Sequence, residues 1–245
     1  MSGIGLLNEK PLHASLKQWC ARPGDRFEVP VDGFVIDIVR DDLLIEIQTR
    51  NLSAINSKLQ RLTRSHQVRL IFPIVKEKWI VRTAATNSSP TIPTAVSTQR
   101  RRGRDAEVAV VRRKSPKRGR LEDLFWELVS IPQLLSNPNF SLEVLMIREE
   151  EVRRYDRRRR KGWVLERRQL LEVVDQHLFT RSEDWLAFVP TGLNSFTSIE
   201  LATGMSANRE LGQKLAYCLR HSRMIELIGK RGRANLYRVA GNGEE

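Results

Sequence analysis

The chain has 245 residues, of which 40% are hydrophobic, and 42 Lys and Arg against 29 Asp and Glu give a formal net charge of +13. This length allows one large or two modest domains, and the charge indicates a polyanionic partner. Residues 100–161 hold 18 Lys and Arg against 10 Asp and Glu, so +8 of the +13 lies there, as in a segment that binds phosphates.

The cysteines and the hydropathy pattern exclude other classes. Cys20 and Cys218 stand far apart and lack the neighbours of a zinc site, which favours free thiols in a reducing compartment. No run approaches 18 apolar residues, and the first ten residues lack a signal-peptide pattern. We therefore expect an intracellular, cytoplasmic protein with no membrane partner.

The first third of the chain, residues 1–84, predicts an α/β domain with the order α-β-β-β-α-β, to which the short strand at 78–82 is an addition. Its expected elements are, in chain order, a helix from Pro11 to about Trp19, a strand at 26–31, a hairpin at 34–49 with its tip at 40–42, a helix at 53–65, a strand at 68–74 broken near Pro73, and a strand at 78–82. The Asp32-Gly33 pair between the first two strands is a turn signal.

The middle of the chain divides at two basic stretches. Residues 85–118 are rich in Ser, Thr, Pro and Arg and predict a disordered basic linker. Residues 119–180 predict an α+β connecting region. Its expected elements are a helix at 121–135, a strand at 141–147, the basic tract at 153–161 and a helix at 167–178.

The last segment, residues 181–245, shows the element order of a winged helix. Thr197-Ser198-Ile199-Glu200 fits the capping box that starts a helix, and Ser206 is a candidate cap for a second helix at 207–222. Two strands, at 224–228 and 235–239, flank a basic turn. We expect a mainly α winged-helix DNA-binding domain here.

Two carboxylates interrupt the apolar hairpin at 34–49, namely Asp37 in its first strand and Glu46 in its second. Burying a carboxylate is costly unless its charge is compensated, and two on adjacent strands suggest a shared hard cation such as Mg²⁺. The alternative is an ordinary hairpin with both carboxylates on its solvent face. Asp32 is a further candidate ligand, although Asp-Gly is more simply a turn. The four histidines form no recognisable catalytic motif.

Residues 5–82 resemble the PD-(D/E)xK nuclease superfamily, especially its small resolvase-like members. Asp37 matches the motif Asp, and Glu46-Ile47-Gln48 matches Glu-x-Lys with Gln48 in the Lys position. The resemblance implies a restriction-endonuclease-like fold in which Asp37, Glu46 and the Ile47 carbonyl hold Mg²⁺ or Mn²⁺, with Gln48 as a water or phosphate contact. Glu9 is the candidate helix acid, and Lys58 is a candidate for the missing cation. The resemblance also raises the expectation of a homodimer.

The nucleic-acid contacts are expected on the winged helix and the basic tract. Arg209, Gln213 and Lys214 lie early on the second helix, where Arg and Gln can read base edges. The basic turn and the basic tract supply phosphate contacts. Their residues are Lys230, Arg231, Arg233, Arg157, Arg158, Arg159 and Arg160.

These patterns support two main hypotheses. The first is a metal-dependent DNA endonuclease with catalytic residues Asp37, Glu46, Gln48 and Glu9. The second is an inactive nuclease-like fold that acts as a DNA-binding regulator or adaptor, which Gln48 favours because an amide cannot supply the positive charge of Lys. A third alternative is that the basic segments bind RNA or an acidic protein.

Overall fold

The structure is a computed structural model that describes residues 10–83, 111–156, 158 and 162–241. Its centre is a mixed seven-stranded sheet in the order β1-β2-β3-β4-β6-β7, with β5 paired to β4 beside this path. The strands are β1 (Arg26–Val31), β2 (Phe34–Arg40), β3 (Leu43–Ile47), β4 (Gln67–Thr83), β5 (Val111–Lys114), β6 (Phe140–Tyr155) and β7 (Trp163–Phe179). The coarse α/β expectation is therefore confirmed.

The first third of the chain has the expected element order. Helix α1 (Pro11–Cys20) begins at a proline, which suits a first helical turn because proline has no N–H to lose there. Strands β1 and β2 are joined at Asp32-Gly33, both with positive φ, as a tight two-residue hairpin requires. A short 3₁₀ turn, η1 (Leu52–Ile55), and helix α2 (Asn56–Leu62) then connect β3 to its parallel neighbour β4.

Strand β4 is one continuous strand of 17 residues, where the sequence predicted a break near Pro73. Ile71 accepts a hydrogen bond from the Gln48 N–H on the β3 side, and β3 ends opposite Ile71. Pro73 lies two residues further along, so its missing N–H faces the same side, where the β3 ladder has already ended. Proline is tolerated in a strand at such an unpaired edge.

The predicted helix at 167–178 is wrong, because these residues belong to β7, which pairs antiparallel with β6 over its whole length. The β6–β7 ladder contains three register shifts. Each shift inserts an extra residue and disturbs the two-residue alternation by which a strand is recognised. Strand β6 is also longer than the predicted 141–147.

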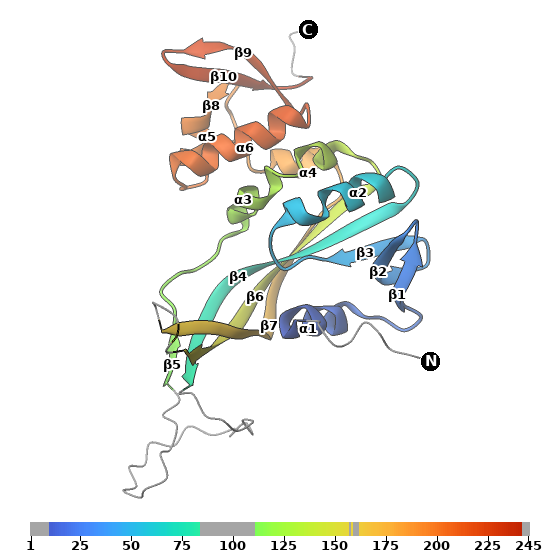
Figure 1. The fold of residues 1–245 in the computed structure, drawn as a ribbon. Coiled ribbons are helices and arrows are strands. Elements are labelled where there is room, and N and C mark those ends of the chain that lie inside the picture. The colour runs from blue at the N-terminus through green and yellow to red at the C-terminus, as the bar shows by residue number, and fades with distance from the viewer. Residues whose placement is uncertain (1–9, 84–110, 157, 159–161, 242–245) are drawn as a thin grey trace, which may run out of the picture.

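The basic linker is partly ordered. Residues 111–114, inside the expected linker at 85–118, form β5 and pair with residues 79–82 of β4. Residues 85–110 of that expectation lie outside the described part of the chain. The far ends of β4, β6 and β7 extend away from the helices together with β5 (Figure 1). We call these ends the distal strands: residues 77–83, 111–114, 148–155 and 163–172.

We call the rest of the seven-stranded sheet, without the distal strands, the proximal sheet. Helices cover both of its faces (Figure 1). On one face, Leu12, Leu16 and Cys20 of α1 pack against apolar side chains of β2, β3, β4 and β6. On the other face, the larger core joins α2 to the elements that follow residue 120. These are η2 (Leu121–Leu124), α3 (Phe125–Leu128) and η3 (Pro132–Ser136), three short pieces where the sequence predicted one helix. Pro132 starts the third piece because it cannot continue the preceding helix.

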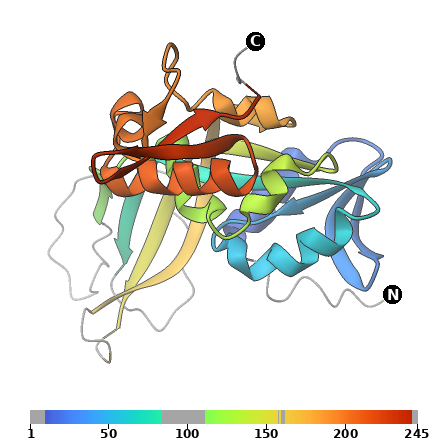
Figure 2. The same cartoon turned by 90° about the horizontal axis from the view of Figure 1, so that it is seen from above.

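The C-terminal region packs on this larger core and adds a three-stranded sheet in the order β8-β10-β9. Its elements are α4 (Ser182–Leu186), β8 (Phe196–Thr197), α5 (Ser198–Gly204), α6 (Arg209–His221), β9 (Ile225–Arg231) and β10 (Ala234–Val239). Seen from above, α6 lies along the β9–β10 hairpin and next to α3 (Figure 2).

Two local details fix the helices of this region. The capping box is present, since Thr197 Oγ1 accepts from the Glu200 N–H at 3.3 Å and Glu200 accepts from the Thr197 N–H at 2.7 Å. Asn208, and not Ser206 as expected, caps α6 by accepting from the Leu211 N–H. A Cβ at Gly212 would lie 2.2 Å from the Ser198 carbonyl oxygen, so glycine permits the close approach of α5 and α6.

Candidate functional site

The candidate site lies where β2 and β3 separate. Their regular ladder covers only the pairs 38–45, 39–44 and 40–43. Asp37 is the next residue along β2, and its Oδ2 accepts a hydrogen bond from the Ile47 N–H at 2.8 Å. A side-chain carboxylate therefore takes the place of a backbone partner at this point. On the other side, β1 is also irregular, because Glu28 adopts a positive φ of 53°.

Glu46 is the second acid of the site and is only 5% exposed. Lys58 of α2 brings its Nζ within 2.7 Å of Glu46 Oε1 and also donates to the Val35 carbonyl at 2.7 Å. This ion pair compensates the charge at Glu46 Oε1, which has no other hydrogen-bond partner among the described residues. Lys58 was predicted from the sequence as a candidate cation near the acids, and in the structure it lies beside Glu46.

His13 of α1 reaches the site from the opposite face of the sheet. Its Nε2 lies 3.2 Å from Asp37 Oδ2. This contact was not predicted from the sequence, because a histidine and an aspartate 24 positions apart form no local motif. The available signal was its position beside Leu12, on the expected helix that begins at Pro11.

The two acids differ in their pKa. Burial alone would raise the pKa of Asp37, but the hydrogen bond and charge of His13, with the Ile47 N–H, hold it below its ordinary value. For Glu46, burial and then the negative charge of Asp37 raise the pKa to about 7, against the opposing effect of Lys58. The two carboxylates lie within electrostatic range of each other, and Glu46 gives up its proton at a higher pH than Asp37.

The donor set at this site fits a magnesium ion in part. Asp37 and Glu46 supply hard oxygens, and Glu46 Oε1 is a buried oxygen without a hydrogen bond. Mg²⁺ is commonly bound through one or two carboxylates together with waters. No group of three or more His, Cys, Asp or Glu suited to a metal is found among the described residues. Glu9, the expected third acid, lies outside them.

Gln48 turns away from the acids. Its Nε2 donates to the carbonyl of Asn51 at 3.1 Å, and Asn51 has a positive φ of 55°. The amide therefore supports the turn that leads into η1. Asp32, the alternative ligand, lies in the β1–β2 turn and pairs with His66 at 2.9 Å.

The residues expected to contact nucleic acid occupy different environments. Arg209 and Gln213 are exposed at the start of α6, and Lys230 and Arg233 are exposed on the β9–β10 hairpin. Two others are engaged within the protein. Lys214 lies over the ring of Trp126 at 4.8 Å, and Arg231 forms a 2.7 Å ion pair with Glu200.

Of the four tract arginines expected to contact nucleic acid, only Arg158 is described, and its N–H donates to Asp156 at 3.0 Å. Arg157, Arg159 and Arg160 lie outside the described residues. Among the described helices, none has both the length and the apolar character needed to cross a membrane.

Comparisons with known proteins give one full-length relative and one family. A protein of Treponema pallidum (strain Nichols) described as "Uncharacterized protein" is 27% identical over 249 residues, covering 98% of this chain and 89% of the relative. No solved structure matches. The model of a family described as "Domain of unknown function (DUF8091)" matches residues 10–106 and 92–180. Because these two matches together cover more than half of the chain, the protein belongs to the DUF8091 family.

Proposed function

We propose that the protein is a metal-dependent DNA endonuclease whose metal ligands are Asp37 and Glu46. The observation that carries this proposal is the placement of these two carboxylates. They come from adjacent strands, interact with each other at the point where the strands separate, and are flanked by Lys58 and His13. Ionisable groups with strongly shifted pKa values gather in this way at functional sites more often than elsewhere.

The element order around these acids supports the proposal. An α-β-β-β-α-β order with β4 parallel to β3 is the arrangement that the resemblance to the PD-(D/E)xK superfamily implies. Motif residues that fall on the expected strands carry more weight than the same letters alone. A restriction-endonuclease-like fold for residues 10–83 is part of the proposal.

Each residue of the site has a proposed task. Mg²⁺ or Mn²⁺ bound by Asp37 and Glu46 would lower the pKa of a bound water and offset the charge on the phosphate. His13 and the Ile47 N–H keep Asp37 ionised and oriented. Lys58, already beside Glu46, supplies the positive charge that Gln48 lacks.

The C-terminal region supports DNA as the substrate. Two helices followed by a hairpin match the order of a winged helix, in which the second helix enters the major groove. Arg209 and Gln213 are exposed near the start of that helix, α6. Lys230 and Arg233 on the hairpin are suited to phosphate contacts. Because Lys214 and Arg231 have partners within the protein, we assign them a smaller share of the binding.

Incubation of the protein with supercoiled plasmid and with branched DNA in Mg²⁺ or Mn²⁺ tests the endonuclease directly. We expect cleavage, and we expect Asp37→Asn and Glu46→Gln each to lower its rate by about 100-fold or more, since a bound metal contributes several kcal/mol to the transition state. Asp32→Asn is the matched control, because Asp32 is an acid of the neighbouring turn. Cleavage that persists in Asp37→Asn would reject the assignment.

One observation favours a second candidate, a nuclease-like protein that binds DNA without cutting it. The Gln48 amide is bonded to the Asn51 carbonyl, and the described residues offer no third acid to the site. Calorimetry with Mg²⁺ separates the two candidates. An endonuclease should bind the ion through Glu46 and lose binding in Glu46→Gln, whereas a pure DNA-binding protein should show no such uptake.

A further inference from the structure

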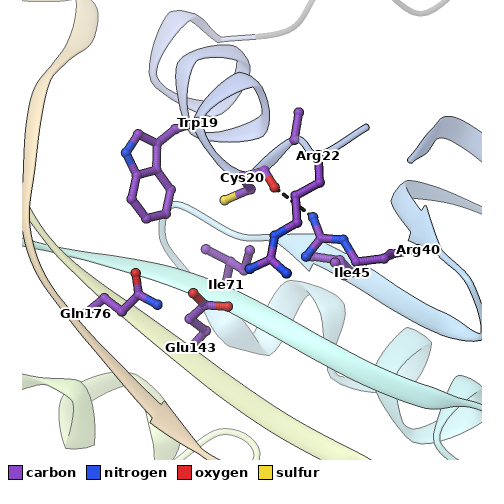
Figure 3. Close-up of a pocket in the computed structure, with 9 residues that line it drawn as sticks. Trp19, Cys20, Arg22, Arg40, Ile45, Ile71, Glu143 and Gln176 are labelled. Atoms are coloured by element: carbon purple, nitrogen blue, oxygen red, sulfur yellow. Dashed lines mark hydrogen bonds between the residues drawn. The ribbon is translucent and has the colours of Figure 1, made fainter. Parts of the chain in front are cut away.

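A small pocket lies on the same sheet face as α1, at the end of that helix opposite to His13. Its volume is about 130 Å³, and the buried side chains of Ile45 and Ile71 line its apolar base. Figure 3 shows the residues around it. A water molecule occupies about 30 Å³ of liquid, so the pocket has room for several waters or for part of a planar ring.

Two flat side chains, Trp19 and Arg22, border this pocket. The indole of Trp19 stands on one side, and the guanidinium of Arg22 lies on the other (Figure 3). Trp19 is 45% exposed, which is unusual for so large an apolar side chain and opens the pocket to solvent. Aromatic faces and guanidinium planes are the surfaces on which unstacked nucleobases pack.

Two hydrogen-bonding side chains lie between these walls, at the sheet. Glu143 comes from β6 and Gln176 from β7, and both border the pocket beneath Trp19 and Arg22 (Figure 3). The Glu143 side chain is 12% exposed, and its ion pair with Arg69 is long, at 3.5 Å. A nearly buried carboxylate with so loose a partner keeps acceptor capacity for a ligand.

The remaining polar groups of the pocket are already used or neutral. Arg40 donates two hydrogen bonds to Asp25 and one to the Cys20 carbonyl, so it is a fixed part of the wall. Burial raises the pKa of the Cys20 thiol to about 12, which leaves it uncharged. The polar groups left to a ligand are therefore the Glu143 carboxylate, the Gln176 amide and the Arg22 donors.

We propose that this pocket receives the edge of one unpaired base of a DNA strand, which packs against Trp19 and Arg22, and that it prefers guanine. Guanine presents two adjacent N–H donors that a carboxylate can accept together, next to a carbonyl that an amide or guanidinium can donate to. Thymine and cytosine lack this paired donor edge. The proposal rests on DNA as the partner in the proposed function, but it does not depend on cleavage.

The test measures binding of labelled short duplexes by fluorescence anisotropy in EDTA, so that no divalent ion and no cutting are involved. The duplexes are fully paired or carry one bulged guanine or one bulged thymine. We expect the guanine bulge to bind about tenfold more tightly than the thymine bulge, the size of a good paired contact to a base. The fully paired duplex should bind more weakly than either.

Variants assign these differences to the pocket. Glu143→Gln should remove the guanine preference, whereas Glu166→Gln, at an exposed β7 residue outside the pocket, should keep it. Trp19→Ala should weaken binding of both bulged duplexes about tenfold, and Trp19→Phe should restore most of it, because stacking survives. Gln176→Ala, at an exposed position, provides a second pocket variant whose folding is not in question, and it should reduce the preference.

Equal binding of all three duplexes, or a guanine preference unchanged in Glu143→Gln and Gln176→Ala, would overturn the proposal. The two proposals fail separately. Loss of base preference in a protein that still cuts plasmid rejects only the pocket. A guanine preference in a protein that never cuts rejects only the endonuclease.

Discussion

The proximal sheet and the distal strands are built from the same β4, β6 and β7 but are stabilised differently. Proximal positions such as Leu70, Leu142 and Val144 are fully buried in apolar surroundings on the larger core. In the distal strands glutamates occupy buried positions, and the fully buried Glu149 lies between Lys78 at 3.2 Å and Arg168 at 2.7 Å. One continuous sheet thus passes from hydrophobic packing to ion pairing along its strands.

This difference shows that a strand can extend well beyond the apolar residues that pack in the hydrophobic core. The distal part of β6 contains Glu149, Glu150 and Glu151 in succession. Glu149 and Glu151 pair with Lys78 of the adjacent β4, and Glu150 pairs with Arg112 of β5, on the far side of β4. Opposite charges on adjacent strands contribute modestly each, and together they extend the sheet beyond its hydrophobic core. We expect the two regions to respond differently to truncation, to pH and to salt.

The largest effect on the free energy of unfolding is expected from truncating one buried side chain of the proximal sheet. Leu142→Ala should lower the free energy of unfolding by about 2–5 kcal/mol, since it removes a fully buried side chain and leaves a cavity. Leu171→Ala is the distal counterpart at an exposed position, and it should cost less than about 1 kcal/mol. Urea unfolding of the two variants measures both values. Equal losses would contradict the division of the sheet.

The next effect is a pH dependence of opposite sign in the two regions. The folded pKa of Glu46, about 7, lies above its ordinary value of 4.5. Its contribution to stability is therefore complete below pH 4.5 and is lost as the pH rises through 7. For Glu151, burial would raise the pKa, but hydrogen bonds from Lys78 and Arg153 hold it below the ordinary value. Its contribution is present above that value and is lost as the pH falls.

Urea unfolding in EDTA across this pH range tests both signs. Relative to Glu46→Gln, the wild type should lose about 3 kcal/mol of unfolding free energy as the pH rises from 4.5 to about 8. Relative to Glu151→Gln, it should lose its advantage as the pH falls below 4.5. Asp37 raises the Glu46 pKa and Lys58 lowers it, so the first difference should shrink in Asp37→Asn and grow in Lys58→Met. If the stability difference between wild type and variant changed with pH in the same direction for Glu46→Gln and Glu151→Gln, the assigned pKa shifts would be contradicted.

The smallest effect is expected from salt. Exposed pairs such as Arg148–Glu172, at 2.5 Å, and Arg112–Glu150, at 2.7 Å, are screened as the ionic strength rises. Between about 0.05 and about 0.5 M salt, amides of the distal strands should exchange with solvent up to about fivefold faster, equivalent to about 1 kcal/mol. Amides of the proximal β4 and β6 residues should not change. Residue-resolved hydrogen exchange would show where along β4 and β6 the salt dependence begins. Equal acceleration of all amides would contradict the division between the two regions.

The sequence predicted those parts of the fold in which local chemistry decides the structure. Helix α1, the three strands from 26 to 47 and the Thr197–Glu200 capping box all depend on short-range signals of periodicity or capping. Strand β7 was mistaken for a helix because its register shifts space Leu170, Val173 and Val174 like one face of a helix. The sequence could not reveal the β6 partner that makes it a strand.

The residues of the candidate site also divide into those that the sequence predicts and those that only the packing of the fold positions. Asp37 and Glu46 could be found from the sequence, because a carboxylate within an apolar strand is costly and therefore conspicuous. Lys58 could only be guessed, and His13 was missed, since both reach the acids through packing of helices on opposite faces of the sheet. Gln48 fits the motif by position, but its amide turns to the Asn51 carbonyl, which depends on the left-handed turn that follows.

The pairing of β4 with β6 has a consequence for how the chain folds during synthesis. Val68 meets Phe140 across 72 positions, whereas the hairpin that holds both acids closes around two residues. Loop closure over such a span is entropically unfavourable and slow. The acidic hairpin can therefore form early, whereas the pairing of β4 with β6 requires residues that are synthesised later. Until residue 155 has left the ribosome, one long edge of β4 remains without its partner and open to misassociation.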